Sequence, residues 1–535
     1  MPSRNESLKW WPWLLGLLCI VDFLVGLGGH ALWDVDEPNN AVCAREMLEA
    51  RNWWVPVFNG DLRYDKPILL YWLLMPAYAL FGVSEWTARL PSALAMTVMV
   101  FVIVVLTRRL SDERTGLMAG TLFASALHIV LIARACVPDP LLMLSLGTAL
   151  PMLLLHYLEH RSASSVGMNR ELVCAYAAIG FGVLAKGPVA VVMPVLIVGL
   201  FLLLMGELRH WRLFLPFRGL AIVALVALPW YITVGVLTDG DWLRGFIMHH
   251  NIDRFTGALQ GHHGFPGYYV LTMLAGWFPW TGLLLAALVF GPWHISRLRR
   301  DPVRLFLLSW ILIYLIFFSI ARTQLPNYML PSFMAAAMLM AVWWRDADAG
   351  LRQRARRWTL VAAVLMAIGI CAGGGYALQR QWPGEWVYLL GVLAVVVAAV
   401  TLRRNMLASL AAGMAVFITS LTLWALPAFD EHKATPVLAR AATSAGFGPD
   451  ALATYHYFQP SLLFYHGGRL PVLEDQRQLA EWLAHGRAVV MPASELSGLP
   501  DGILPYVVVY ARVHGLYARK WLVLISLQPV GGAHG

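Results

Sequence analysis

Residues 33–66 read WDVDEPNNAVCAREMLEARNWWVPVFNGDLRYDK, a polar stretch that separates two apolar ones at residues 10–32 and 67–82. It opens on an acidic turn, continues through an amphipathic helical pattern and then passes the pair Trp53 and Trp54. Tryptophan is enriched in the headgroup layer of a bilayer. The stretch therefore predicts an outer loop with amphipathic helices, held between segments that enter a membrane.

The composition of the whole chain agrees with a membrane protein. Of the 535 residues, 59% are hydrophobic and 13% are charged, and the mean hydropathy is +0.63. An ordinary soluble domain has roughly 45–50% apolar and about 25% charged residues. This balance excludes a disordered chain, a coiled coil and most soluble enzymes. The long unbroken apolar runs also disfavour a transmembrane β-barrel, whose strands alternate in polarity.

The apolar runs predict an all-α polytopic bundle over residues 1–429. A membrane span needs ~20 apolar residues, with about 17 as the lower limit. The apolar stretches lie at residues 10–32, 67–82, 88–107, 116–133, 139–157, 171–185, 188–205, 219–237, 267–292, 304–320, 327–344, 358–378, 385–402 and 406–427. After residue 430 the pattern changes to short apolar runs such as YVVVYARV and a helical run, DQRQLAEWLAHG. Residues 430–535 are therefore expected to form a small soluble α/β domain.

The basic residues predict the topology. The net charge of +9 comes from short Arg clusters between the apolar runs, which is the pattern of cytoplasmic loops and not of a nucleic-acid-binding face. With the N-terminus in the cytoplasm, the clusters keep to one side only if one early stretch does not cross. The best candidate is 67–82, which is short and contains Pro76. This gives thirteen crossings and places residues 430–535 outside the cytoplasm.

Charged and aromatic residues then gather on the outward side, in loops that are far apart in sequence. Polar groups held near lipid are costly and usually functional. We therefore expect an active or binding site at this rim, with ordinary solvated loop ends as the alternative. The residues concerned include Asp36, Glu37, Tyr64, Asp65, Lys66, Asp139, Lys186 and Tyr328.

An ordered set of motifs resembles a known family, the aminoarabinose transferases that modify lipid A. This family groups with the protein O-mannosyltransferases among the C-type, multi-span glycosyltransferases. The resemblance covers roughly residues 10–345. The matching segments are Asp36-Glu37, REML at 45–48, RYDKP at 63–67, FGVSEWTARLPSA at 81–93, Asp139, LAKGP at 184–188, HNIDRF at 250–255, GWFPW at 276–280 and QLPNYMLP at 324–331.

The resemblance implies sugar transfer on the outer face of a bacterial inner membrane, with the C-terminal domain in the periplasm. The donor would be a polyprenyl phosphate that carries an aminoarabinose-like pentose or a hexose. The acceptor would be lipid A or another glycolipid or glycan, and no nucleotide cofactor would be needed. Membrane lipids are the other expected partners, and nucleic acid is not one.

The resemblance also implies roles for single residues. Asp36 matches an essential carboxylate, as general base or acceptor-orienting group, with Glu37 and Asp139 beside it as further catalytic candidates. The candidates for the donor phosphate and sugar are Lys66, Lys186, Arg254, Tyr328 and Tyr64. The alternatives are helix capping for Asp36 and Asp139, a turn for Lys186, a snorkelling side chain for Lys66, and interfacial placement for Arg254 and Tyr328.

A divalent metal such as zinc is a further expectation of the resemblance. Asp65 would be one ligand, and His249 or His250 would supply the imidazole. A carboxylate with imidazoles suits zinc, but interfacial or substrate-contacting roles are the alternative for these residues.

Two other functions compete with the transferase. A transporter or flippase for a lipid-linked saccharide would need polar residues near the middle of the membrane and related halves. A scaffold protein would use the outer domain for assembly and would have no need of the charged rim residues.

Overall fold

The structure, a computed structural model, describes residues 6–162, 167–252, 265, 267–381, 405–500, 502–515 and 520–527, with the backbone alone at 6–8, 249–252 and 373–381. The chain divides into two compact units, each of which is described by itself. The first comprises residues 1–27, 64–73 and 89–421, and the second comprises residues 28–63, 74–88 and 422–535.

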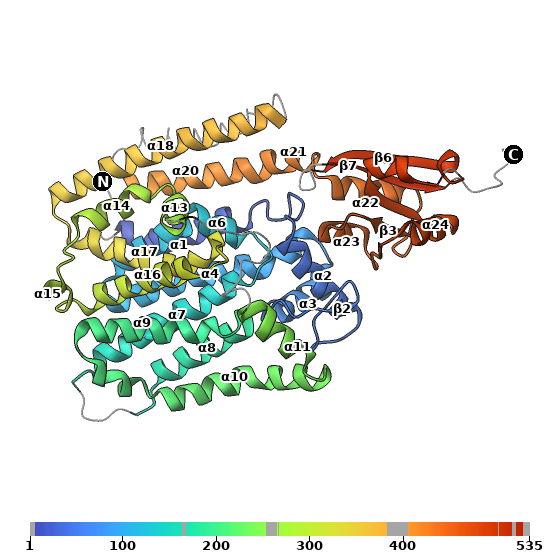
Figure 1. The fold of residues 1–535 in the computed structure, drawn as a ribbon. Helices are drawn as coiled ribbons and strands as arrows, with labels where there is room; N and C mark the ends of the chain where they lie inside the picture. Colours follow the sequence, from blue (N-terminus) through green and yellow to red (C-terminus); the bar gives the residue numbers. More distant parts are fainter. Residues whose placement is uncertain are drawn as a thin grey trace. The chain divides into compact units, whose positions relative to one another are not determined.

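The first unit is helical. Three helical elements, α3 (Leu69–Phe81), α4 (Glu85–Leu110) and η7 (Leu421–Ala425), contribute residues to both units. The other helices of the first unit are α1 (Glu6–Cys19), η1 (Ile20–Leu24), α5 (Glu113–Ala124), α6 (Leu127–Ala133), α7 (Asp139–His160), α8 (Arg170–Lys186), α9 (Val189–Met205), η2 (Leu208–Phe214), α10 (Pro216–Leu237), α11 (Asp241–Arg244), η3 (Gly245–Ile252), α13 (Tyr268–Gly276), α14 (Thr281–Phe290), α15 (Ile295–Leu298), α16 (Pro302–Ile320), η5 (Pro326–Met329), α17 (Leu330–Asp346), α18 (Ala349–Gln381) and α20 (Met406–Ser420) (Figure 1).

Six helical stretches among the described residues are long and apolar enough to cross a membrane. They belong to α4, α7, α10, α16 and α18 and to the run Met406–Asp430. The pair α5 and α6, bent by 68° at its break, would be a seventh. These helices confirm a multi-span helical membrane protein, whereas the count of thirteen crossings stays a prediction. At 13 residues, α3 is shorter than a span requires, in line with the expectation that 67–82 does not cross.

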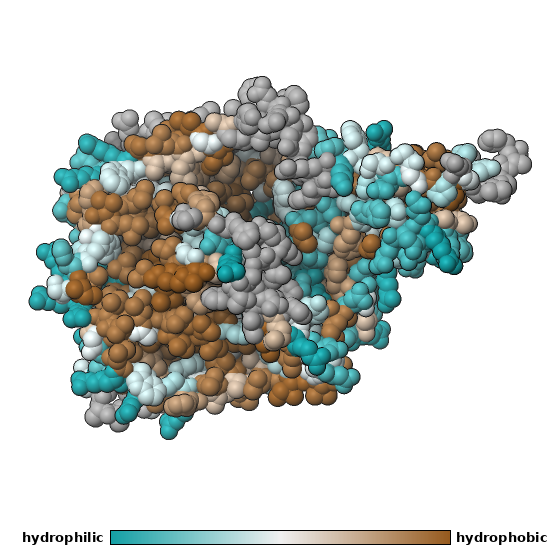
Figure 2. All heavy atoms as spheres, in the orientation of Figure 1, coloured by the Kyte–Doolittle hydropathy of each residue, from teal (hydrophilic) through white to brown (hydrophobic). Residues whose placement is uncertain are grey.

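Helix α17 is the centre of the first unit. Every residue from Leu330 to Trp343 is buried, and α17 contacts α5, α7, α14 and α16. A helix that is apolar all round is stable only when neighbours cover all its faces. The outer helices differ, because they expose large side chains such as Phe217 (79%) and Leu225 (77%) on α10. Figure 2 shows hydrophobic side chains over the face of the helical unit in view, the surface that lipid would cover.

Buried arginines satisfy the backbone where the first helix ends. The guanidinium of Arg134 donates to the carbonyl oxygens of Asp22 (3.1 Å) and Val25 (2.8 Å), and Arg89 donates to that of Leu27 (2.9 Å). The last carbonyls of a helix have no partner within it, and unsatisfied backbone groups are costly in apolar surroundings. Both arginines thus fix the point where the chain leaves the first helix and enters the acidic loop.

The second unit contains a mixed five-stranded sheet in the order β4-β3-β5-β7-β6. Strand β3 runs parallel to β4 and β5, and β7 runs antiparallel to β5 and β6. All residues of β5 are buried, as expected for a strand that is covered on both faces. The elements of this unit are α2 (Asp36–Glu49), β1 (Val57–Phe58), β2 (Asp61–Leu62), η7 (Leu421–Ala425), α21 (Leu426–Asp430), α22 (Ala434–Ser444), β3 (Leu452–Tyr455), α23 (Pro460–His466), β4 (Val472–Leu473), α24 (Gln476–Ala484), β5 (Ala488–Pro492), η8 (Ala493–Gly498), η9 (Leu504–Tyr506), β6 (Val507–Gly515) and β7 (Lys520–Leu527).

The close packing of α14 on α18 gives a test of the fold. A Cβ at Gly282 would lie 2.2 Å from the carbonyl oxygen of Trp358 and 2.4 Å from the Cα of Thr359. Because both atoms are backbone, Gly282→Leu must push α18 away, and overpacking costs about 1–3 kcal/mol. We expect a lower Tm for the purified protein in detergent. The control is Gly199→Leu on α9, where no atom lies within 4 Å; an equal loss of Tm in both variants would contradict the packing.

Candidate active site

Asp36 and Glu37 begin helix α2 in the second unit, and their surroundings differ. Glu37 is buried at 3% exposure, and its Oε2 accepts the backbone N–H of Trp33 at 2.8 Å. Asp36 is exposed, and no hydrogen bond or ion pair joins its carboxylate to another residue in the described part of the chain. The residue that precedes α2, Val35, makes no side-chain cap. Glu37 is thus engaged by the backbone of the preceding loop, and Asp36 is left available to a solute.

The loop that leads to Asp36 is held by Asp34. The two carboxylate oxygens of Asp34 accept the backbone N–H of Ser461, at 2.9 Å, and the hydroxyl of Ser461. The Ser461 hydroxyl also lies 2.7 Å from that of Thr435. Burial raises the pKa of Asp34, and the two hydrogen bonds from Ser461 oppose this rise. A partly buried carboxylate that is held in this way fixes the backbone two residues before Asp36.

Further contacts hold the same loop by its backbone. The N–H of Ala31 donates to Asp430, and the carbonyl of Ala31 accepts from the Nζ of Lys433 at 2.9 Å. The N–H of Leu32 donates to the Tyr465 hydroxyl at 2.8 Å. Lys433 is only 3% exposed and also pairs with Asp430 at 2.9 Å. We call these contacts, together with the Asp34–Ser461 pair, the loop clamp.

Three of the predicted site residues come together in the first unit. Lys186, the last residue of α8, lies 2.6 Å from the carboxylate of Asp139, the first residue of α7, and its Nζ is 5.5 Å from the centre of the Tyr328 ring. A carboxylate at a helix N-terminus and a cation at a C-terminus both suit the helix dipole. The pair is largely buried, with side-chain exposures of 17% and 9%. The ammonium has three donors, so a phosphate oxygen could share it with Asp139.

Sequence reasoning missed His128 near this pair. His128 lies on α6, within hydrogen-bond distance of Asn327 and close enough to Asp139 for the two side chains to interact electrostatically. Asn327 belongs to the QLPNYMLP motif, one of the segments that carry the family resemblance. His128 lies inside an apolar run, and no sequence motif marks it as a site residue.

The structure describes some of the remaining candidate residues and not others. Tyr64, Asp65 and Lys66 are half-buried, and the Tyr64 ring packs against Gly245 at the start of η3. Arg254 and the side chains of His249 and His250 lie outside the described residues. Among the described residues there is no group of three or more His, Cys, Asp or Glu side chains that could hold a metal ion. The metal expectation built on Asp65, His249 and His250 has no support from these residues.

The geometry provides two chemically distinct groups, which belong to different units. One is an exposed carboxylate on the first turn of α2, directly after the clamped loop, suited to accept a proton or to orient a nucleophile. The other is a cation with a phenol ring beside it, suited to negative charge on a leaving phosphate. Neither group identifies the sugar.

Comparison with known proteins agrees with the motifs. Residues 65–232 match the family model for dolichyl-phosphate-mannose-protein mannosyltransferase. The undecaprenyl phosphate-α-4-amino-4-deoxy-L-arabinose arabinosyl transferase of Pectobacterium carotovorum is 31% identical over 423 residues, which are 76% of this chain and 74% of that protein. The corresponding enzyme of Serratia proteamaculans is 29% identical over 413 residues, covering 74% and 72%.

Solved structures share the fold. ArnT from Cupriavidus metallidurans, bound to undecaprenyl phosphate, superposes with a TM-score of 0.78 at 21% identity and covers 98% of this chain and 99% of its own. The Archaeoglobus fulgidus oligosaccharyltransferase superposes with a TM-score of 0.53 at 12% identity, over 94% and 73%. The fold is therefore that of the C-type membrane glycosyltransferases. The sequence is 31% identical to the Pectobacterium carotovorum enzyme over 76% of this chain and 74% of that enzyme, and the fold is shared. The chain therefore belongs to the family of undecaprenyl phosphate-aminoarabinose arabinosyl transferases.

Proposed function

We propose that this protein moves a sugar from a polyprenyl phosphate donor to a glycolipid acceptor, with Asp36 as the residue that orients or deprotonates the acceptor. The donor sugar would be 4-amino-4-deoxy-L-arabinose or a related pentose or hexose, and the acceptor would be lipid A or another periplasmic glycolipid. Family membership favours a transferase over a flippase or a scaffold. The observation that carries the residue assignment is the exposed Asp36 at the start of α2, whose carboxylate no other described residue engages. The loop before it is held at Ala31, Leu32 and Asp34.

The reaction exchanges one bond at the anomeric carbon of the sugar for another. An oxygen of the acceptor attacks that carbon, the bond to the donor phosphate breaks, and the phosphate leaves on its polyprenyl chain with the electron pair. Where the acceptor is a hydroxyl, its proton passes to the Asp36 carboxylate. Where the acceptor is already a phosphate anion, Asp36 only orients it.

Lys186 is our main candidate for stabilising the leaving phosphate. Its contact with Asp139 fixes the ammonium at the end of α8, and the Tyr328 ring lies beside it. A fixed cation stabilises charge that develops during bond breaking without reorganisation. Lys66, Arg254 and Tyr64 stay candidates for the same donor by resemblance, and we propose no metal.

We place the protein in the bacterial inner membrane, with its N-terminus in the cytoplasm. Residues 430–535 would then form a periplasmic domain that follows a transmembrane domain over residues 1–429. The basic clusters between the apolar runs support this orientation, as does the chemistry, because nucleotide sugars are scarce outside the cytoplasm and a lipid-linked donor is needed there.

The first functional prediction concerns Asp36. We expect Asp36→Asn to reduce transfer about 10²–10⁴-fold, the usual contribution of a general base, with unchanged protein level and Tm. The measurement is mass spectrometry of lipid A and other envelope glycolipids from cells that carry either variant. Asp61→Asn, which changes an exposed aspartate of the same unit, is the control. Wild-type levels of the sugar adduct in Asp36→Asn cells would refute the role.

The second concerns Lys186. Lys186→Met should reduce kcat about 10²–10³-fold, as loss of one charge-stabilising donor does, whereas Lys186→Arg should recover part of the rate because it keeps the cation. Asp139→Asn should reduce kcat less, since the ammonium remains. The assay follows release of polyprenyl phosphate by the purified protein, with Lys520→Met, at an exposed position, as the control. If Lys186→Arg is as inactive as Lys186→Met while both keep the wild-type Tm, charge alone is not what Lys186 supplies.

A further inference from the structure

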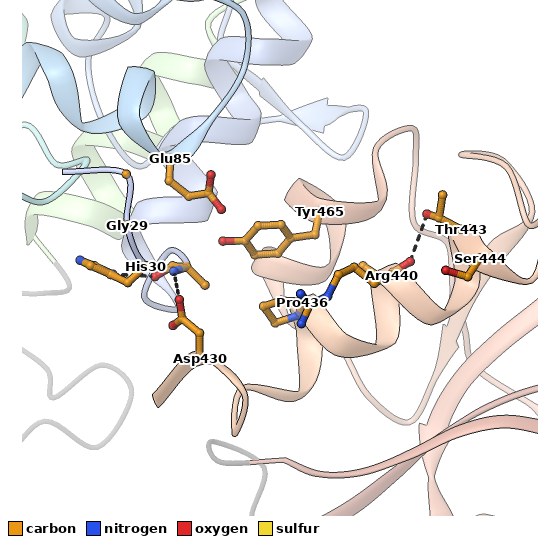
Figure 3. Close-up of a pocket in the computed structure, with 12 residues that line it drawn as sticks. Gly29, His30, Glu85, Asp430, Pro436, Arg440, Thr443, Ser444 and Tyr465 are labelled. Carbon is orange, nitrogen blue, oxygen red and sulfur yellow. Dashed lines mark hydrogen bonds between the residues drawn. The ribbon is translucent and has the colours of Figure 1, made fainter. Parts of the chain in front are cut away.

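The second unit contains a cavity that the proposed reaction has not used. It has a volume of about 510 Å³, within the range of about 300–1,000 Å³ that is usual for small-molecule sites. Its walls are the loop at residues 28–31, the start of α4, the end of α21, and helices α22 and α23. Figure 3 shows the polar side chains of these elements around one space, with the carboxylate of Glu85 directed toward Tyr465.

The loop clamp makes this cavity preformed. Ala31 lines it, and both backbone polar groups of Ala31 are taken, by Asp430 and by Lys433. Tyr465 lines it too, and its hydroxyl accepts from Leu32. A site whose walls are already hydrogen-bonded loses little conformational freedom when a ligand enters.

Two charged side chains of the wall remain available. Asp430 is engaged by Ala31 and Lys433. By contrast, within the described residues no ion pair or hydrogen bond engages the side chains of Glu85 and Arg440. Arg440 lies on α22, and its side chain runs back along the helix toward Pro436 (Figure 3). The cavity thus offers a guanidinium and a carboxylate that the protein itself does not neutralise.

These two groups indicate the chemistry of a ligand. A guanidinium recognises phosphate by paired hydrogen bonds, and a carboxylate accepts hydrogen bonds from sugar hydroxyls or an ammonium group. The aliphatic side chains of the lining are small, those of Ala31, Pro436 and Ala439, and the rings of His30 and Tyr465 complete the wall. These leave room for a sugar ring but offer little surface to a long isoprenoid or acyl chain. These features fit a phosphorylated sugar better than a lipid chain.

We infer that this cavity binds the phosphorylated sugar headgroup of the acceptor glycolipid, with Arg440 on a phosphate and Glu85 on the sugar. The inference rests on the proposed function, in which donor and acceptor must be bound at once. In that proposal the donor phosphate is bound by cations of the first unit, mainly by Lys186. The cavity belongs to the same unit as Asp36, and its loop wall leads within five residues to that carboxylate.

Binding can be measured without turnover. The full-length Asp36→Asn protein in detergent is titrated calorimetrically with a phosphorylated glucosamine disaccharide from which the acyl chains have been removed. Adding Arg440→Gln should weaken binding at least tenfold, and adding Glu85→Gln about threefold. Two controls should stay within twofold: Arg477→Gln, at an exposed arginine of the same unit, and Glu113→Gln, at another acidic residue in the first turn of a helix. Inorganic phosphate, as competitor, tests whether the phosphate alone suffices.

The outcomes separate this inference from the proposed function. Unchanged affinity in both cavity variants, or no binding of the disaccharide, overturns the cavity assignment even if the wild-type protein transfers sugar. Weaker binding of polyprenyl phosphate in Arg440→Gln, with the disaccharide unaffected, also overturns it and assigns the cavity to the donor. If the wild-type protein transfers no sugar but binds the disaccharide through Arg440, the proposed function fails and the binding site stands. An acceptor KM raised about tenfold in Arg440→Gln, with the donor KM unchanged, supports both.

Discussion

The hydrogen bonds that hold residues 31–34 are the constraint on which the acidic loop depends. Asp34 accepts two hydrogen bonds from Ser461, and Lys433, which is almost fully buried, donates to the backbone of the same loop. A buried charge is tolerated only when it is paired and hydrogen-bonded. Another conformation of the loop would break the hydrogen bonds of Asp34 to Ser461 and that of Lys433 to Ala31, so these bonds favour the observed one. They fix the backbone just before Asp36.

The helical unit applies the same rule in apolar surroundings. Arg134 and Arg89 take the carbonyls at the end of the first helix, and the Asp139–Lys186 pair joins the ends of two neighbouring helices. Each of these four side chains meets a partner of opposite sign or a backbone carbonyl. This differs from the buried part of α17, residues 330–343, where every side chain except that of Ser332 is apolar and neighbouring helices cover it. The four charged side chains lie at or near helix ends, where the backbone already needs partners.

Much of the helical unit could be predicted from sequence, because long apolar runs and short helices such as α3 follow from hydropathy and length. The grouping of Asp139, Lys186 and Tyr328 was also accessible, since each lies in a motif at the outward end of a predicted helix. The loop clamp was not, because Asp34 and Ser461 are 427 residues apart and neither belongs to a periodic pattern. The cavity was hidden for the same reason. Glu85 lies in the motif at residues 81–93 and Arg440 in the C-terminal region, and no sequence pattern links the two before the fold brings them to one space.

A transferase that uses two lipid-borne substrates must distinguish two phosphates, and charge alone cannot do so. The surroundings of each cation can distinguish the two phosphates. Lys186 is largely buried, with Asp139 and an aromatic ring beside it, so that charge forming on a leaving phosphate would be stabilised in surroundings of low dielectric constant. Arg440 is exposed on a cavity with small side chains and a carboxylate, which suits a hydrated sugar phosphate that stays intact. The first arrangement favours a transition state and the second favours a ground state, and only the first accelerates a reaction.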